Sequence, residues 1–178
     1  MIRVKKDKTM KTKKNRSFII FSVLGLLVCF FLVQCTTTKK IEKLTSGDIK
    51  NMIDSSRFVF NAERVNPLRG RTRYLTSSYD VTVKKDSVES FLPYFGRVYQ
   101  APMDPSKGGI QFTSTDFSYT VNSGSKDDQW DVVIKPKDNN DVQEMRFNIF
   151  GNGTASLNVT STHKDAISFT GHVERIKK

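Results

Sequence analysis

The sequence predicts a mainly β protein, in which an antiparallel sheet of about eight strands closes into a barrel or sandwich after one short N-terminal helix. From residue 57 onward, apolar and polar residues alternate with a period of two, the pattern of strands that bury one face. Short turns rich in Gly, Asn, Asp and Ser separate the alternating runs. Helical spacing of apolar residues is seen in one stretch after the leader, near residue 50.

The helix is expected over about residues 46–56. Thr45 is placed as its N-cap, and Asp48 stands three residues on, where its carboxylate can accept a hydrogen bond from the backbone of the cap. The apolar residues that share one face are Ile49, Met52 and Ile53.

Each expected strand has apolar or small residues at every second position. Pro67 ends the first strand, and Gly151-Asn152-Gly153 predicts a tight hairpin turn. Residues 44–178 show no internal boundary and are expected to form a single domain. In chain order the alternating sets are Phe58, Phe60 and Ala62; Tyr79, Val81 and Val83; Ile110 and Phe112; Phe117, Tyr119 and Val121; Trp130, Val132 and Ile134; Met145, Phe147 and Ile149; Ala155, Leu157 and Val159; and Ile167, Phe169, Gly171 and Val173.

Residues 1–34 have the composition of an export signal. The first 16 positions include eight Lys or Arg residues, and an uncharged apolar run follows over residues 18–33. Met1 and Met10 are both possible starts of this leader. Because the leader holds most of the net charge of +11, the charge does not indicate a nucleic-acid partner, and none is expected.

The residues that end the leader, Leu32-Val33-Gln34-Cys35, resemble the lipobox at which bacterial lipoproteins are lipidated on Cys and cleaved before it. Leu32 and Val33 fit the pattern, whereas Gln34 departs from the small residue usual before the Cys. We expect Cys35 to carry the lipid that anchors the protein to a membrane, and residues 35–43 to be the lipidated Cys with a polar spacer. The alternative is an uncleaved signal anchor.

An unusual stretch at residues 91–97 reads FLPYFGR, and residues 108–112 (GGIQF), 153–159 (GTASLNV) and 167–171 (ISFTG) accompany it. Together these segments resemble the DUF4251 family of uncharacterised lipoproteins, found mainly in Bacteroidota, over roughly residues 44–176. The resemblance implies an exported, lipid-anchored, mostly β domain with no established activity and no catalytic residues. In such lipoproteins an acidic run after the Cys tends to mark surface export. It is absent here, so a periplasm-facing anchor in the outer membrane is expected.

Residues 91–99 are the candidate ligand-binding segment, through Tyr94, Arg97 and Tyr99. Their aromatic rings and single guanidinium can stack on a sugar or peptide and form a charged hydrogen bond. The alternative is architectural: a bend whose aromatic residues close the end of the barrel. A basic run at Arg64, Arg69, Arg71 and Arg73 is either a contact for an acidic surface, such as anionic headgroups, or a solvated loop.

The sequence contains no catalytic or metal-binding motif, and no cofactor is expected. His163 and His172 are the two histidines, without HExxH spacing, and no GxSxG elbow is present. Cys29 lies in the leader, so the mature chain has no Cys pair. The tripeptide Asp86-Ser87-Val88 is similar to the D-S/T-apolar acceptor of general O-glycosylation in Bacteroidota. Ser87 is therefore a candidate for O-glycosylation.

The leading expectation is an exported, lipid-anchored envelope protein with a non-enzymatic binding or structural role, whose partner is an envelope protein or a glycan. A ligand-binding module for a glycan, peptide or lipophilic ligand is the alternative. A periplasmic hydrolase comes third, and it would need a histidine, an acid and a hydroxyl within hydrogen-bond reach of one another.

Overall fold

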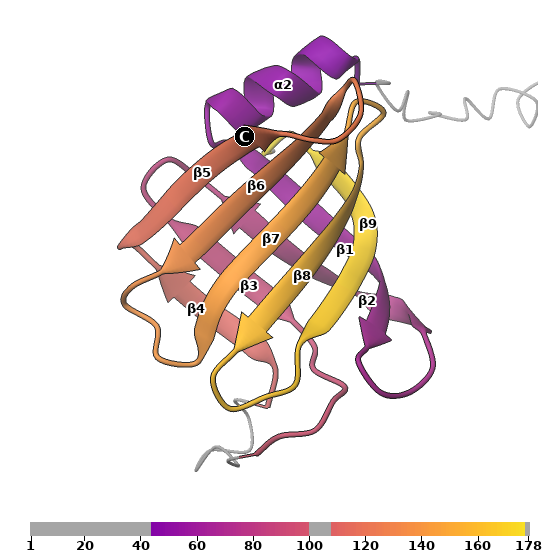
Figure 1. Cartoon of the computed structure of the whole chain (residues 1–178), viewed down its shortest axis with the longest axis vertical. Helices are drawn as coiled ribbons and strands as arrows, with labels where there is room; N and C mark the ends of the chain where they lie inside the picture. The colour runs from indigo at the N-terminus through magenta and orange to yellow at the C-terminus, as the bar shows by residue number, and fades with distance from the viewer. Residues whose placement is uncertain (1–43, 100–107, 177–178) are drawn as a thin grey trace, which may run out of the picture. The chain divides into compact units, whose positions relative to one another are not determined.

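The computed structural model describes residues 44–99 and 108–176 (Figure 1). In this part of the chain one helix, α2 (Ser46–Asp54), precedes nine antiparallel strands that form a nearly closed barrel, which confirms the predicted fold class. None of the described helices is long and apolar enough to cross a membrane. The strands are β1 (Phe58–Pro67), β2 (Arg73–Val83), β3 (Val88–Leu92), β4 (Ile110–Ser114), β5 (Phe117–Ser123), β6 (Gln129–Pro136), β7 (Val142–Phe150), β8 (Thr154–Ser161) and β9 (Ile167–Glu174).

The order of the strands explains why the barrel is not fully closed. Neighbours in the sheet follow the order β4-β3-β2-β1-β9-β8-β7-β6-β5, so β4 and β5 are its two edges. With nine alternating strands, these two edge strands run in the same sense, and only residues 115–116 connect them. Parallel neighbours need a much longer connection. The chain therefore turns a corner between β4 in the back layer and β5 in the front layer (Figure 1).

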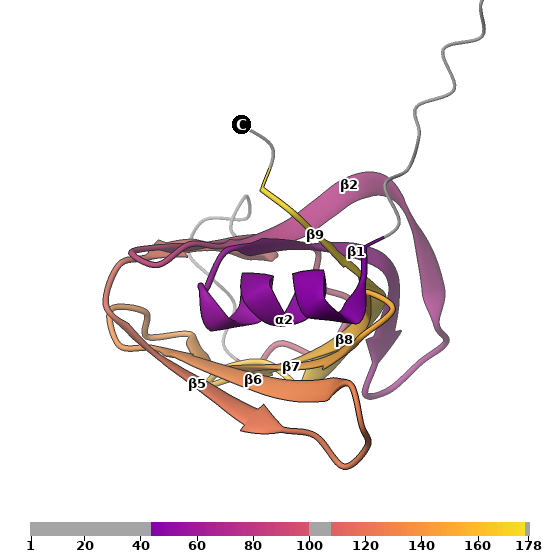
Figure 2. The same cartoon turned by 90° about the horizontal axis from the view of Figure 1, so that it is seen from above.

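The helix α2 forms as the sequence predicts and covers one end of the barrel (Figure 2). Thr45 and Asp48 make the capping box, in which the Thr45 backbone N–H donates to Asp48 Oδ2 over 3.0 Å. The Tyr119 hydroxyl of β5 donates to the carbonyl of Ile53 over 2.8 Å and fastens the helix to the open edge. The helix ends at Asp54, two residues earlier than expected, because Ser56 adopts a positive φ of 52°. Its buried residues are Ile49, Met52 and Ile53.

The barrel interior is filled by side chains. The Phe147 ring lies edge-on to the rings of Phe58 and Phe60, with 5.7 Å between centroids in both pairs. The alternating apolar sets predicted for β1, β7, β8 and β9 supply half of the buried apolar residues, as expected for a small barrel. Its largest fully buried side chains are Phe58, Phe60, Phe147, Phe169, Ile49, Ile53, Leu92, Ile110, Ile134, Met145, Ile149 and Leu157.

Two strands differ from the prediction. β3 was not predicted, because Ser90 interrupts its apolar alternation; Ser90 is buried nonetheless, and its hydroxyl donates to the carbonyl of Ile110 over 2.8 Å. β2 begins at Arg73, six residues before the first apolar residue expected for it. Most of these added residues are exposed, since the β1–β2 hairpin continues past a register shift between Ala62 and Arg64.

Candidate functional site

Residues 94–99 run across the end of the barrel opposite α2 and are joined there to the connection between β8 and β9 (Figure 1). Val98 forms an isolated antiparallel bridge with Lys164. The Tyr99 N–H donates to the carbonyl of His163 over 2.8 Å, and the Asp165 N–H donates to the carbonyl of Arg97 over 3.1 Å. The segment is therefore fixed by backbone hydrogen bonds to a part of the chain more than 60 residues away in sequence.

Tyr94 is the part of this segment that closes the barrel. Its side chain is half-buried against the core. Its hydroxyl donates to the carbonyl of Arg97 over 2.8 Å and lies 3.0 Å from the carbonyl of Asp165. Burial raises the pKa of Tyr94, and the negative charge of Asp165 raises it further. A neutral Tyr94 hydroxyl that is satisfied by backbone carbonyls indicates a structural role for this side chain.

An ion pair between a buried lysine and a partly exposed aspartate supports the same end of the barrel. Lys164 is buried, and its Nζ lies 2.6 Å from Asp141 Oδ2, 3.2 Å from the carbonyl of Gly109 and 5.7 Å from the centroid of the Tyr94 ring. The other carboxylate oxygen of Asp141 is buried without a hydrogen-bond partner among the described residues. This ion pair was not predicted from the sequence, because no local pattern marks a lysine as buried.

Arg97 and Tyr99 differ from Tyr94 in that they face solvent. Arg97 is exposed, and Tyr99 is 63% exposed. The Tyr99 hydroxyl donates to the Asp165 carboxylate, and this hydrogen bond raises the pKa of Tyr99. The structure thus brings the three predicted residues to one end of the barrel, but only Arg97 and Tyr99 present side chains that a ligand can reach.

The basic run adjoins this segment. Across the β1–β2 hairpin, the Arg64 guanidinium lies 5.9 Å from the centroid of the Tyr74 ring. The Arg73 guanidinium lies 5.2 Å from the centroid of the Phe95 ring, which connects the hairpin to residues 94–99. Two features that were separate in the sequence therefore meet on one surface.

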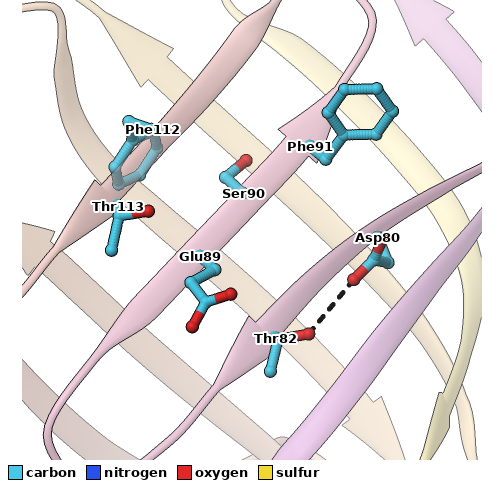
Figure 3. Close-up of a pocket in the computed structure, with 7 residues that line it drawn as sticks. All are labelled: Asp80, Thr82, Glu89, Ser90, Phe91, Phe112 and Thr113. Atoms are coloured by element: carbon cyan, nitrogen blue, oxygen red, sulfur yellow. Dashed lines mark hydrogen bonds between the residues drawn. The ribbon is translucent and has the colours of Figure 1, made fainter.

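A second candidate site is a shallow pocket of about 350 Å³ on the outer face of β2, β3 and β4 (Figure 3). Thr82 Oγ1 donates to Asp80 Oδ2 over 3.1 Å, and Glu89 Oε1 accepts from Lys84 Nζ over 2.6 Å. Phe91 is 49% exposed beside them. The lining residues are Asp80, Thr82, Glu89, Ser90, Phe91, Phe112 and Thr113.

The pocket offers carboxylate and hydroxyl oxygens next to one exposed aromatic ring, groups that can bind hydroxyl or amine donors. The Phe91 ring stacks on Tyr79 with centroids 5.7 Å apart and planes at 23°. A neighbouring hollow of about 330 Å³ shares Asp80 and Glu89 and extends to Glu174. The pocket was not predicted from the sequence, because it depends on the register between strands, which the alternation of apolar residues does not define.

The remaining candidate residues lie apart from both sites. His172, on the outer face of β9, has Nδ1 2.8 Å from Glu63 Oε1 and Nε2 3.0 Å from Glu174 Oε1. Ser87 lies in the β2–β3 turn, where its carbonyl accepts from the N–H of Lys84. Within residues 44–99 and 108–176, no group of three or more His, Cys, Asp or Glu side chains is placed to hold a metal ion. Cys35 lies outside the described residues.

Comparison with known proteins gives a family and a fold. No curated protein matches the chain. A crystal structure of a DUF4251 family protein from Bacteroides eggerthii DSM 20697 is similar, with a TM-score of 0.50 and 16% sequence identity over 73% of this chain and 87% of that chain. At this identity the similarity concerns the fold alone. The family model named "Domain of unknown function (DUF4251)" matches residues 41–173. The chain therefore belongs to the DUF4251 family.

Proposed function

We propose that this protein is exported, anchored by lipid on Cys35, and has a non-enzymatic binding or structural role at the outer membrane, facing the periplasm. The observation that carries the proposal is the order of segments along the chain. A basic and then apolar leader ends at Cys35, and the family domain begins at residue 41. A Cys followed by a short polar spacer and a folded domain is the arrangement of a lipid-anchored protein, in which the anchor replaces a spanning helix.

The described domain supports a binding or structural role over catalysis. Large apolar side chains fill its interior, and residues 94–99 are fixed by hydrogen bonds to the β8–β9 connection. Its accessible polar groups lie on outer surfaces, in the pocket beside Phe91 and around Arg97. A hydrolase is supported less well, since both ring nitrogens of His172 contact carboxylates.

The test is metabolic labelling with a palmitate analogue in a Bacteroidota host, followed by membrane fractionation. The chain contains two cysteines, Cys29 and Cys35, which provide a matched pair of variants. We expect Cys35→Ala to abolish labelling and leave the leader uncleaved, and Cys29→Ala to be labelled and processed like wild type. Normal processing and membrane retention of Cys35→Ala would refute the lipid anchor, whereas a wild-type chain that is unlabelled and keeps its leader would favour an uncleaved signal helix.

A second candidate function is ligand binding at residues 91–99, which the exposure of Arg97 and Tyr99 favours. In this arrangement Tyr94 positions the segment and does not touch the ligand. Envelope glycans, peptides and lipophilic molecules are the ligand classes that such a segment suits.

A further inference from the structure

We infer that the end of the barrel opposite α2 binds an anionic polysaccharide. The inference deepens the second candidate function by naming the ligand class, and it rests on that function. We call the site the Arg–aromatic surface. It consists of Arg64, Arg69, Arg71, Arg73 and Arg97 together with Leu68, Tyr74, Phe95 and Tyr99.

The arginines of this surface are available to an external anion. All five are exposed, and within the described residues none of them forms an ion pair with an acidic side chain. Arg64 donates from Nε to the hydroxyl of Thr170 over 3.1 Å, which leaves its terminal NH₂ groups for other acceptors. A guanidinium fork matches carboxylate and phosphate groups with two parallel hydrogen bonds.

The same surface gathers apolar side chains that a water-soluble domain usually buries. Tyr74 is 78% exposed, Leu68 65% and Phe95 37%, in addition to Tyr99. Exposed aromatic rings next to arginines are the composition of binding hot spots. Tyrosine and phenylalanine faces stack on the apolar faces of sugar rings, whereas the guanidiniums bind the charged substituents. A polysaccharide that carries carboxylates or phosphates satisfies both groups of side chains at once.

The residues form one continuous surface although they come from different segments. Arg64 pairs with Tyr74 across β1 and β2, and Arg73 reaches the Phe95 ring after β3. Arg69 and Arg97 lie close enough to Tyr99 to act electrostatically on its hydroxyl. The β1–β2 connection and the segment after β3 both lie at the end of the barrel away from α2 (Figure 1).

Chain length leaves the anchoring bilayer as the competing occupant, which the experiment tests with vesicles. Nine residue steps separate Cys35 from Leu44, which starts the described domain at the α2 end, and they span at most about 30 Å. β1 has ten residues, but barrel strands tilt by about 35–45°, so it rises only about 25 Å along the barrel. The composition of the Arg–aromatic surface, and not the length of the tether, therefore favours a polysaccharide.

The experiment measures the binding of the full chain, purified in detergent, to polygalacturonate, whose every sugar ring carries a carboxylate. Neutral dextran is the uncharged control. The test variant combines Arg69→Gln, Arg73→Gln and Arg97→Gln. The matched variant combines Arg57→Gln, Lys85→Gln and Lys126→Gln, which removes the same charge from exposed positions at the α2 end.

We expect wild type and the matched variant to retain polygalacturonate with similar affinity, and the arginine variant to lose about tenfold or more. Tyr74→Ala, which leaves the core untouched, should also weaken binding and keeps the test valid if the arginine variant does not fold. Dextran should not bind. A lack of labelling at Cys35 would leave these results unchanged, so the two proposals fail separately.

Three results would overturn the inference. Equal losses in both triple variants would mean that only net charge matters. Binding to vesicles of phosphatidylglycerol without binding to polygalacturonate would assign the surface to a membrane. Unchanged binding of Tyr74→Ala and of the arginine variant would place any polysaccharide site elsewhere, with the pocket beside Phe91 as the next candidate.

Discussion

Gly171→Ala tests the packing on which the barrel depends. Gly171 in β9 lies opposite Ala62 in β1 and Ala155 in β8. A Cβ at this position would lie 1.9 Å from the carbonyl oxygen of Asn61, 2.9 Å from the carbonyl carbon of the same residue and 3.2 Å from the Cα of Ala62. These are backbone atoms, so the clash can be relieved only by separating β1 from β9.

The expected cost follows from this geometry. An overpacked core loses about 1–3 kcal/mol, and the upper end applies here because no side chain can move aside. We therefore expect Gly171→Ala to lower the free energy of unfolding by about 3 kcal/mol. For a domain of this size, such a loss lowers the Tm by roughly 10 °C.

Urea and thermal unfolding followed by circular dichroism measure the effect, and Gly47→Ala is the matched control. Gly47 lies in the first turn of α2, where the nearest atom to an added Cβ is Thr45 Oγ1 at 3.8 Å. Alanine is the better helix former, so the control should gain up to about 1 kcal/mol. A Gly171→Ala protein within about 0.5 kcal/mol of wild type would refute the close approach of β1 and β9.

The other predictions concern the end of the barrel opposite α2 and the corner between β4 and β5. Lys164→Met should destabilise the fold by about 2 kcal/mol, because it leaves the Asp141 carboxylate without its cation, and adding Asp141→Asn should recover part of the loss in urea titrations. Tyr94→Phe should cost about 1 kcal/mol in the same assay and leave polygalacturonate binding unchanged, whereas a loss of binding would make Tyr94 part of the site. Asp138 accepts from the Ser114 hydroxyl and from the N–H groups of Thr115 and Asp116, and these bonds lower the pKa of Asp138 below its usual 3.8. The stabilisation of the fold by the Asp138 carboxylate is therefore complete above pH 3.8 and is lost as the pH falls through the lowered pKa. The difference in Tm between wild type and Asp138→Asn should consequently disappear at acidic pH. A gap that is constant with pH would show that the carboxylate charge contributes nothing.

Local patterns were sufficient to predict most of the fold. The capping box at Thr45 and Asp48 involves neighbours in sequence, and both of its hydrogen bonds form. The period-two alternation identified most buried residues of β1, β6, β7, β8 and β9, because each of these strands has one face in the core. The set predicted for β5 is only partly buried, and its Val121 is exposed at the open edge of the sheet. β3 was missed, since its central inward residue is Ser90, whose burial depends on the distant carbonyl of Ile110.

The candidate sites could be predicted only in pieces. The basic run and residues 91–97 were each visible in the sequence, but their contact through Arg73 and Phe95 depends on how β3 and the β1–β2 hairpin end. The pocket beside Phe91 depends on the pairing of Asp80 with Phe91 and of Thr82 with Glu89. Cross-strand register is set by the whole sheet, so no local pattern carries it.

Mass spectrometry of the mature N-terminus is the decisive test of the proposed lipid anchor on Cys35. The protein would be extracted with detergent from the membranes of a Bacteroidota host and digested, and the N-terminal peptide analysed. We expect a first residue Cys35 that carries a diacylglyceryl group and an amide-linked acyl chain, with residues 1–34 absent. An N-terminal peptide that begins at Met1 or Met10, or an unmodified Cys35 thiol, would contradict the lipid anchor.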